Sequence, residues 1–273
     1  MKNILTGMTL LLVSNLYAQH SVEKIWQSDT ILKTPESVLY DKGARVLYVS
    51  NMNSAPGGKK ESGFISKLDL NGKMIKSDFI TGLDGPKGLG RYKNLLYVAE
   101  MTEVSVIDAI KGTVVQRITV EGAQLLNDIT VDSRGIVYVS DTRTNKVHRI
   151  ENGKPTVYLE NMKSANGVLA VGTDLYILTN GSLQKADANK NLITVADGMD
   201  PSTDGIEMVK ENEFIVSCWN GIVYYGKSDG SKQVLFDTRE QKINSADIGY
   251  DAMNKIVYVP TFFKNSIYAY KLK

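Results

Sequence analysis

A pattern of about 40 residues repeats six times along this chain, and it limits the possible folds more than any other feature of the sequence. Each copy opens with a short alternating segment, passes through a turn and continues into an apolar segment such as Val-Leu-Tyr-Val-Ser at 46–50. A fixed period of this length is typical of propellers and solenoids, and it is not expected of a sandwich. The six copies open, in chain order, at Glu36, Lys87, Asn127, Asn166, Asp204 and Ala246.

Each repeat has room for four short strands. The apolar segment is followed by two further strand-like pieces, such as 146–150 and 156–159, with Asn152-Gly153 between them. Asn71-Gly72 and Asp229-Gly230 occur at matching places in other repeats, and such pairs favour tight hairpin turns. No stretch shows a helical period with caps at both ends. The sequence therefore predicts an all-β fold, a six-bladed β-propeller of four-stranded antiparallel blades.

The two ends of the chain are expected to share the last blade. The sixth repeat begins at Ser245, and the chain ends at Lys273, so only three strands fit in it. The segment 22–27, Val-Glu-Lys-Ile-Trp-Gln, can supply the missing outer strand and close the ring. Residues 19–273 are accordingly predicted to form a single domain.

Residues 1–18 have the layout of a secretory signal peptide. Lys2 precedes an apolar stretch centred on 10–13, and small or polar residues lead to Ala18. The apolar run is shorter than the ~20 residues that span a bilayer. We expect cleavage after Ala18 and an exported protein, periplasmic or extracellular, with no membrane span. The lone Cys218 lies in an apolar stretch, which predicts a buried thiol.

Charge and cysteine content exclude some classes of partner. The chain has 32 Lys and Arg against 30 Asp and Glu, a net charge of +2, so the sequence gives no support to a nucleic-acid partner. A single cysteine excludes a zinc site built from several thiolates. We expect a monomer whose partner is a small molecule.

The opening residues of the six repeats suggest a metal site. In a propeller the innermost strands line a central channel, so their first residues form a ring at one mouth. Four of the six carry side-chain oxygens that suit a hard divalent cation: Glu36, Asn127, Asn166 and Asp204. We expect calcium, with zinc, manganese or magnesium as alternatives. Without a cation, Glu36 and Asp204 should repel each other, and at least one should hold its proton more tightly.

A polar lining without any cation remains the alternative for this ring. Polar residues line any water-filled channel, and Asn166-Gly167 also suits a turn.

The repeats and their opening motifs resemble the regucalcin/gluconolactonase family and, more distantly, the paraoxonase-type lactonases. The resemblance extends over essentially the whole mature chain. It rests on the following motifs: Pro35-Glu36 followed by Val-Leu-Tyr-Asp, Asn127-Asp128, Asn166-Gly167 and Asp204-Gly205. It implies a divalent ion, often calcium, at the channel mouth, with Glu36, Asn166 and Asp204 as direct ligands. It further implies that Asn127 is a ligand or a substrate contact and that Asp204 is the general base.

Three features depart from those families. Leu125 and Leu126 precede Asn127, where the regucalcin type tends to have an Arg shortly before the Asn. The paraoxonase type uses a pair of histidines as base, whereas this chain has only His20 and His148. Lys87 in the ring is unexpected, and it would either hold an anionic group of a substrate or offset the carboxylates.

The segments that follow the second strand of each blade are expected to surround the mouth. Candidate substrate contacts are Lys87, Asn51, Arg143, Trp219 and Phe262. This mixture suits a small polar organic ligand, although packing between blades explains Trp219 and Phe262 equally well. The Gly-rich segment 53–63 is expected to be a flexible flap over the pocket.

The sequence therefore favours an exported, metal-dependent hydrolase that opens a sugar lactone or a similar ester. The alternative is a non-catalytic propeller that binds a small molecule, a glycan or a protein on the same face. In a third interpretation the ion is purely structural.

Overall fold

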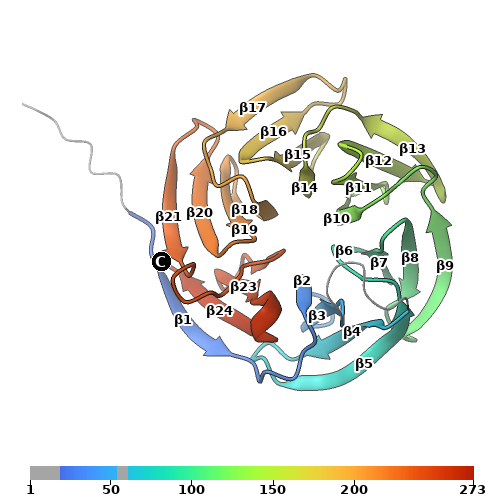
Figure 1. The fold of residues 1–273 in the computed structure, drawn as a ribbon, viewed down its shortest axis with the longest axis horizontal. Helices are drawn as coiled ribbons and strands as arrows, with labels where there is room; N and C mark the ends of the chain where they lie inside the picture. The colour runs from blue at the N-terminus through green and yellow to red at the C-terminus, as the bar shows by residue number, and fades with distance from the viewer. Residues whose placement is uncertain (1–18, 54–60) are drawn as a thin grey trace, which may run out of the picture.

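Six four-stranded sheets surround a central channel (Figure 1). The computed structural model describes residues 19–53 and 61–273. Within every sheet, neighbouring strands are antiparallel. The prediction of an all-β propeller with six blades is thus confirmed. The predicted signal peptide and residues 54–60 of the predicted flap lie outside the described residues.

The first three blades follow one another along the chain, each with its strands in sequence order from the channel outwards. The first blade contains β2 (Pro35–Asp41), β3 (Val46–Asn51), β4 (Gly63–Leu68) and β5 (Met74–Leu83). The second contains β6 (Leu89–Tyr92), β7 (Leu95–Ala99), β8 (Glu103–Asp108) and β9 (Thr113–Thr119). The third contains β10 (Leu126–Val131), β11 (Val137–Asp141), β12 (Lys146–Glu151) and β13 (Lys154–Leu159).

The last three blades complete the ring. The fourth contains β14 (Ala165–Val171), β15 (Asp174–Thr179), β16 (Ser182–Ala186) and β17 (Leu192–Ala196). The fifth contains β18 (Thr203–Lys210), β19 (Glu213–Cys218), β20 (Ile222–Lys227) and β21 (Lys232–Asp237). The sixth contains β22 (Gly249–Asp251), β23 (Ile256–Pro260), β24 (Ile267–Leu272) and β1 (Val22–Gln27), with the short 3-10 helix η1 (Phe262–Lys264) after β23.

The N-terminal strand closes the ring as the sequence predicts. Strand β1 pairs with β24, from Val22 opposite Leu272 to Gln27 opposite Tyr268, and Figure 1 shows these two strands side by side. The indole of Trp26 packs over Gly72 of the first blade, where an added Cβ would lie 2.6 Å from the ring. The N-terminal strand is therefore tied to both blades at the junction.

The apolar core lies between adjacent blades. One cluster joins Leu178 and Met199 of the fourth blade to Phe214 and Cys218 of the fifth, and similar clusters lie at the other junctions. Cys218 is fully buried and has no disulfide partner among the described residues, as predicted. Burial raises the pKa of its thiol, so the unreactive protonated form is favoured.

Glycines serve two purposes in this fold: one forms a tight turn, and another allows two strands to approach closely. Asn152 and Gly153, with φ of 51° and 72°, form the predicted two-residue turn between β12 and β13. Gly167, in contrast, lies within the inner strand β14, where an added Cβ would lie 2.3 Å from the carbonyl oxygen of Asp204. The Asn166-Gly167 pair is therefore not a turn. Its glycine allows the inner strands of the fourth and fifth blades to approach closely.

Among the described residues, no helix has the length and apolar character required to cross a membrane.

Candidate functional site

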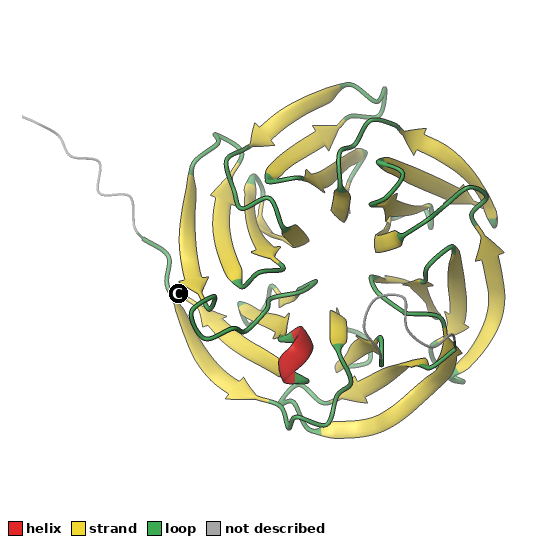
Figure 2. Ribbon diagram, in the orientation of Figure 1, coloured by secondary structure: helices red, strands yellow, loops and turns green. Residues whose placement is uncertain are grey.

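The six opening residues of the repeats lie at or just before the start of the inner strands. Figure 2 shows these strands arranged around the central channel. The four oxygen-bearing ones are each the second residue of an inner strand: Glu36 in β2, Asn127 in β10, Asn166 in β14 and Asp204 in β18. Lys87 and Ala246 lie just before β6 and β22. Four blades thus bring side-chain oxygens to the same end of the channel.

A hydrogen bond joins two of the predicted ligands across a blade junction. The Nδ2 atom of Asn166 donates to Oδ1 of Asp204 over 3.0 Å, and Asp204 is almost fully buried. Because the amide nitrogen is engaged, the amide oxygen Oδ1 of Asn166 is the atom left as an acceptor. It is buried and has no hydrogen-bond partner. A buried acceptor without a donor is uncommon, and it marks a place where a ligand would be stabilised.

Glu36 presents a second such acceptor. Its side chain is only 7% exposed, and Oε2 is buried with no hydrogen-bond partner. Burial raises the pKa of Glu36 well above its ordinary value, and the charge of Asp204 raises it further, while Lys87 opposes the shift. Burial, followed by the charge of Asp247, likewise raises the pKa of Asp204. The charge of Asp204 thus raises the pKa of Glu36 in the expected direction, whereas the charge that raises the pKa of Asp204 is that of Asp247.

Asn127 is held by the neighbouring mouth segment. Its Nδ2 donates to Oγ1 of Thr142 over 3.1 Å, and that hydroxyl donates to the carbonyl of Ala165 over 2.7 Å. The amide nitrogen is thus used by the protein, and the amide oxygen is available to a ligand. Asn127 is half-buried, so it is more accessible than Glu36 or Asp204.

The chemistry of these residues fits one kind of cation. In residues 19–53 and 61–273, no group of three or more His, Cys, Asp and Glu side chains could hold a metal ion. A cation at the mouth would therefore need amide oxygens beside the carboxylates of Glu36 and Asp204. An all-oxygen set of this kind suits calcium or magnesium, whereas zinc prefers nitrogen and sulfur ligands.

Lys87 brings a cationic group to the same ring. Its Nζ donates to the carbonyl of Gly85 over 3.1 Å and lies 3.5 Å from Sδ of Met101. Burial lowers the pKa of Lys87, nearby Glu36 raises it, and Arg143 contributes a smaller lowering. Arg143 is exposed and near enough to influence Lys87, and the carboxylates of Asp84 and Glu100 are also near enough to do so. The second and third blades thus bring two cations and two carboxylates to one side of the mouth.

Two of the other predicted substrate contacts are packed into the protein. Asn51 is fully buried: its Oδ1 accepts from the backbone of Lys33, and its Nδ2 donates to the carbonyl of Val49 and to Ser66. Its amide is thus used inside the blade and is not free for a ligand. Phe262 is 3% exposed, which supports the packing interpretation for that ring.

Three carboxylates deeper in the channel are absent from the sequence prediction. Asp128, Glu207 and Asp247 line a cavity of about 220 Å³ between the inner strands of the first five blades and the segment 247–248 that precedes β22. Asp247 accepts a 2.5 Å hydrogen bond from Ser37, and burial raises its pKa to about 7. Burial, with a smaller effect of Asp247, raises the pKa of Glu207 to about 8.

A local irregularity explains why Asp128 was missed. In a regular strand the side chain after Asn127 would point to the opposite face of the sheet. The pairing of β10 with β11 shifts register between Leu126 and Ile129, so a bulge includes both Asn127 and Asp128. The consecutive polar pair Asn-Asp was the only signal in the sequence.

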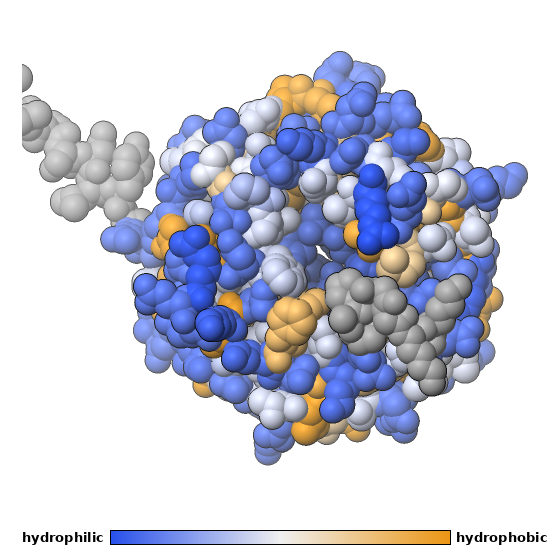
Figure 3. Space-filling model, viewed as in Figure 1, coloured by the Kyte–Doolittle hydropathy of each residue, from blue (hydrophilic) through white to orange (hydrophobic). Residues whose placement is uncertain are grey.

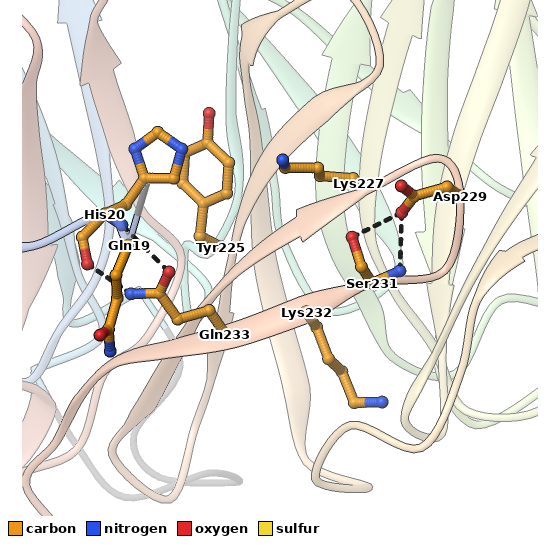
Figure 4. Close-up of a pocket in the computed structure, with 8 residues that line it drawn as sticks. All are labelled: Gln19, His20, Tyr225, Lys227, Asp229, Ser231, Lys232 and Gln233. Atoms are coloured by element: carbon orange, nitrogen blue, oxygen red, sulfur yellow. Dashed lines mark hydrogen bonds between the residues drawn. The ribbon is translucent and has the colours of Figure 1, made fainter. Parts of the chain in front are cut away.

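Neither described histidine belongs to the channel mouth. His148 is buried in β12, with Nε2 3.8 Å from Oδ2 of Asp141, which agrees with a packing role. His20 stacks on Tyr225 of the fifth blade with ring centroids 3.8 Å apart. Gln233 accepts from the backbone N–H of His20 and donates to its carbonyl, beside a hollow of about 410 Å³ (Figure 4). A histidine dyad of the paraoxonase type is therefore absent from the described mouth.

The fold and the site together define a six-bladed propeller with buried carboxylates and half-buried amides at one mouth of its channel. Comparison with solved structures finds the same fold in a streptogramin B lyase, with a TM-score of 0.69 and 13% identity, covering 93% of this chain and 98% of that one. A virginiamycin B lyase from Staphylococcus aureus matches with a TM-score of 0.62 and 14% identity, covering 89% of this chain and 82% of that one.

No protein-family model and no curated protein matches the sequence. The solved structures establish the six-bladed fold, and at these identities they establish nothing about the chemistry of this chain.

Proposed function

We propose that this protein is an exported, divalent-cation-dependent hydrolase that opens a lactone or a similar ester at the channel mouth. The observation that carries the proposal is the pair of buried oxygens without partners, Oε2 of Glu36 and Oδ1 of Asn166. Both belong to residues that the sequence analysis chose as cation ligands, and a cation would supply the interaction that each oxygen lacks.

Glu36, Asn166 and Asp204 would hold the cation, with Asn127 as a further ligand or a contact to the substrate. A bound divalent cation polarises the carbonyl of an ester and stabilises the negative charge that develops on its oxygen. The two carboxylates and the amides supply a net charge of about −2, which a divalent ion would neutralise.

Asp204 is the residue proposed as general base. Asn166 fixes the orientation of its carboxylate through Oδ1, which leaves the other carboxylate oxygen to accept a proton. Asp204 would take a proton from the attacking water as the new C–O bond forms. The ring C–O bond then breaks, and the proton passes to the oxygen that leaves.

The likeness to two lyases of the same fold supports an enzyme over a propeller that only binds. A lyase and a hydrolase would give different products from a lactone, because hydrolysis adds the mass of one water and elimination does not. The mass of the product therefore decides between the two classes.

The proposal is tested with purified protein, assayed on a panel of sugar and aliphatic lactones with calcium, magnesium, manganese or zinc. We expect turnover with an oxygen-preferring cation, a product heavier by one water, and a loss of at least about 100-fold in Asp204→Asn. Asp229→Asn is the control, because Asp229 lies in the turn after β20 in the same blade, away from the mouth. Absence of turnover with every cation, or full activity of Asp204→Asn, would refute the proposal.

A further inference from the structure

Exposed aromatic rings form one side of the channel mouth. Trp219 follows β19, and Phe263 lies in η1; the two side chains are 39% and 58% exposed. Their ring centroids are 6.0 Å apart in an edge-to-face arrangement, and both rings also contact Phe262. Single exposed apolar residues are common on proteins, but neighbouring exposed aromatics at the mouth of a channel are a typical binding surface.

Packing and hydrogen bonds support this aromatic side and join it to the ring of opening residues. The buried Phe262 packs with Met52 and Ala246, and Ala246 is the ring position of the sixth blade. Backbone and side-chain hydrogen bonds hold the supporting segments: Trp219 N–H to the carbonyl of Ser202 over 2.8 Å, and Thr34 N–H to Oδ1 of Asn265 over 2.9 Å. Rigid aromatic rings lose little conformational entropy when they bind a ligand.

The opposite side of the mouth carries an exposed cation, Arg143, in addition to the buried Lys87. In a ring of six blades, the second and third blades lie opposite the fifth and sixth (Figure 1). Lys87 and Arg143 belong to that side, whereas Trp219 and Phe263 belong to the other. Figure 3 shows an apolar patch at η1 beside the central opening and hydrophilic side chains across the opening, over β10 and β11.

The geometry points to a substrate with two different ends: an ester or lactone with a flat apolar ring on one side of its carbonyl and a carboxylate on the other. This inference rests on the proposed function of the mouth. The apolar ring would stack on Trp219 and Phe263, and the carboxylate would pair with the guanidinium of Arg143. The carbonyl then lies between them, over Glu36 and Asp204.

Four matched lactones separate the contribution of the aromatic rings from that of Arg143. They are γ-butyrolactone, γ-phenyl-γ-butyrolactone, the β-carboxylate of γ-butyrolactone, and the compound with both substituents. Initial rates of ring opening, measured with calcium present, give kcat/KM for each lactone. Calorimetric titration with the four corresponding lactams measures affinity without any reaction, because lactams resist opening.

The variants are Phe263→Ala and Arg143→Ala, each with a control on the far side of its own blade. Met253→Ala is the control for Phe263, since Met253 is 73% exposed in the turn between β22 and β23. Arg134→Ala is the control for Arg143, since Arg134 lies in the turn between β10 and β11.

We expect the compound with both substituents to bind most tightly. Phe263→Ala should weaken the two phenyl compounds about five- to tenfold and leave the other two unchanged. Arg143→Ala should weaken the two carboxylates about three- to fivefold and leave the neutral compounds unchanged. Both controls should behave as the unmodified protein.

The two proposals fail in different ways. If the lactams show this pattern while no lactone is turned over, the two-ended site stands and the hydrolase proposal fails. If lactones are opened but all four bind equally well, or if neither variant discriminates among them, the two-ended site is refuted and the hydrolase proposal survives.

Discussion

The side-chain amide of Asn166 donates a 3.0 Å hydrogen bond to Oδ1 of Asp204, across the junction of the fourth and fifth blades. This bond favours the charged carboxylate and so lowers the pKa of Asp204, against the larger raising effects of burial and of Asp247. Two residues 38 positions apart are thus coupled in one site.

Removal of this bond should move the pH dependence of activity. In Asn166→Ala the pKa of Asp204 rises, so the acidic limb of the kcat/KM profile, measured at saturating cation, should move to higher pH. Asn189→Ala, at an exposed turn of the same blade, should leave the profile unchanged. An acidic limb at the same pH in Asn166→Ala would show that Asp204 is not the titrating base.

Glu207 should make the protein less stable as the pH rises. Its pKa in the folded protein is about 8, above the ordinary value of 4.5, because burial and the charge of Asp247 disfavour its ionised form. Its stabilising contribution is complete below about pH 4.5 and is lost progressively up to about pH 8. The free energy of unfolding should therefore fall across this interval.

Glu207→Gln tests this dependence by urea unfolding from pH 5 to pH 8 in the presence of a chelator. The variant should be more stable than the unmodified protein at pH 8 by about 1–3 kcal/mol, and the difference should shrink towards pH 5. Glu240→Gln, at an exposed position of the same blade, is the control. A difference that does not vary with pH would contradict the raised pKa.

Close contact between inner strands should make Gly167 intolerant of a side chain. In Gly167→Ala the new Cβ would meet the carbonyl oxygen of Asp204 at 2.3 Å, so we expect a loss of about 2–4 kcal/mol. Gly226→Ala is the control, because no atom lies within 4 Å of that Cβ. Chemical denaturation measures the free energy of unfolding of both variants, and equal values would refute the packing argument.

Closure of the ring should depend on Trp26. Its indole packs against Gly72 and lies 5.8 Å from the ring of Tyr258, so Trp26→Ala should cost about 2–3 kcal/mol. The adjacent Ile25 is 42% exposed, and Ile25→Ala should cost less than about 1 kcal/mol. Thermal unfolding compares the two, and a Trp26→Ala variant as stable as Ile25→Ala would argue against this role.

The architecture could be predicted from the sequence because every blade is built from the same pattern of strands and turns. Alternating apolar segments and Asn-Gly turns recur at a fixed period, and the incomplete sixth repeat indicated that β1 would pair with β24. The four oxygen-bearing ring residues followed from their position at the start of the inner strands.

Features that depend on local irregularity could not be read from the sequence. The bulge at the start of β10 was not visible in the alternation, so Asp128 was overlooked. Phe262 adopts a positive φ of 48°, which leaves its ring buried and the ring of Phe263 exposed. The burial of Asn51 depends on partners as distant as Lys33 and Ser66, which no local pattern reveals.

Binding of calcium to the chelator-treated protein, followed by calorimetric titration and by thermal unfolding, tests the account most directly. We predict about one ion per chain, and a Tm that rises by roughly 5–10 °C when free calcium is 100 times the dissociation constant. Glu36→Gln should lose both effects and remain folded, because it removes a buried charge without changing the shape of the side chain. No ion bound to the unmodified protein, and no change in its Tm, would contradict the account.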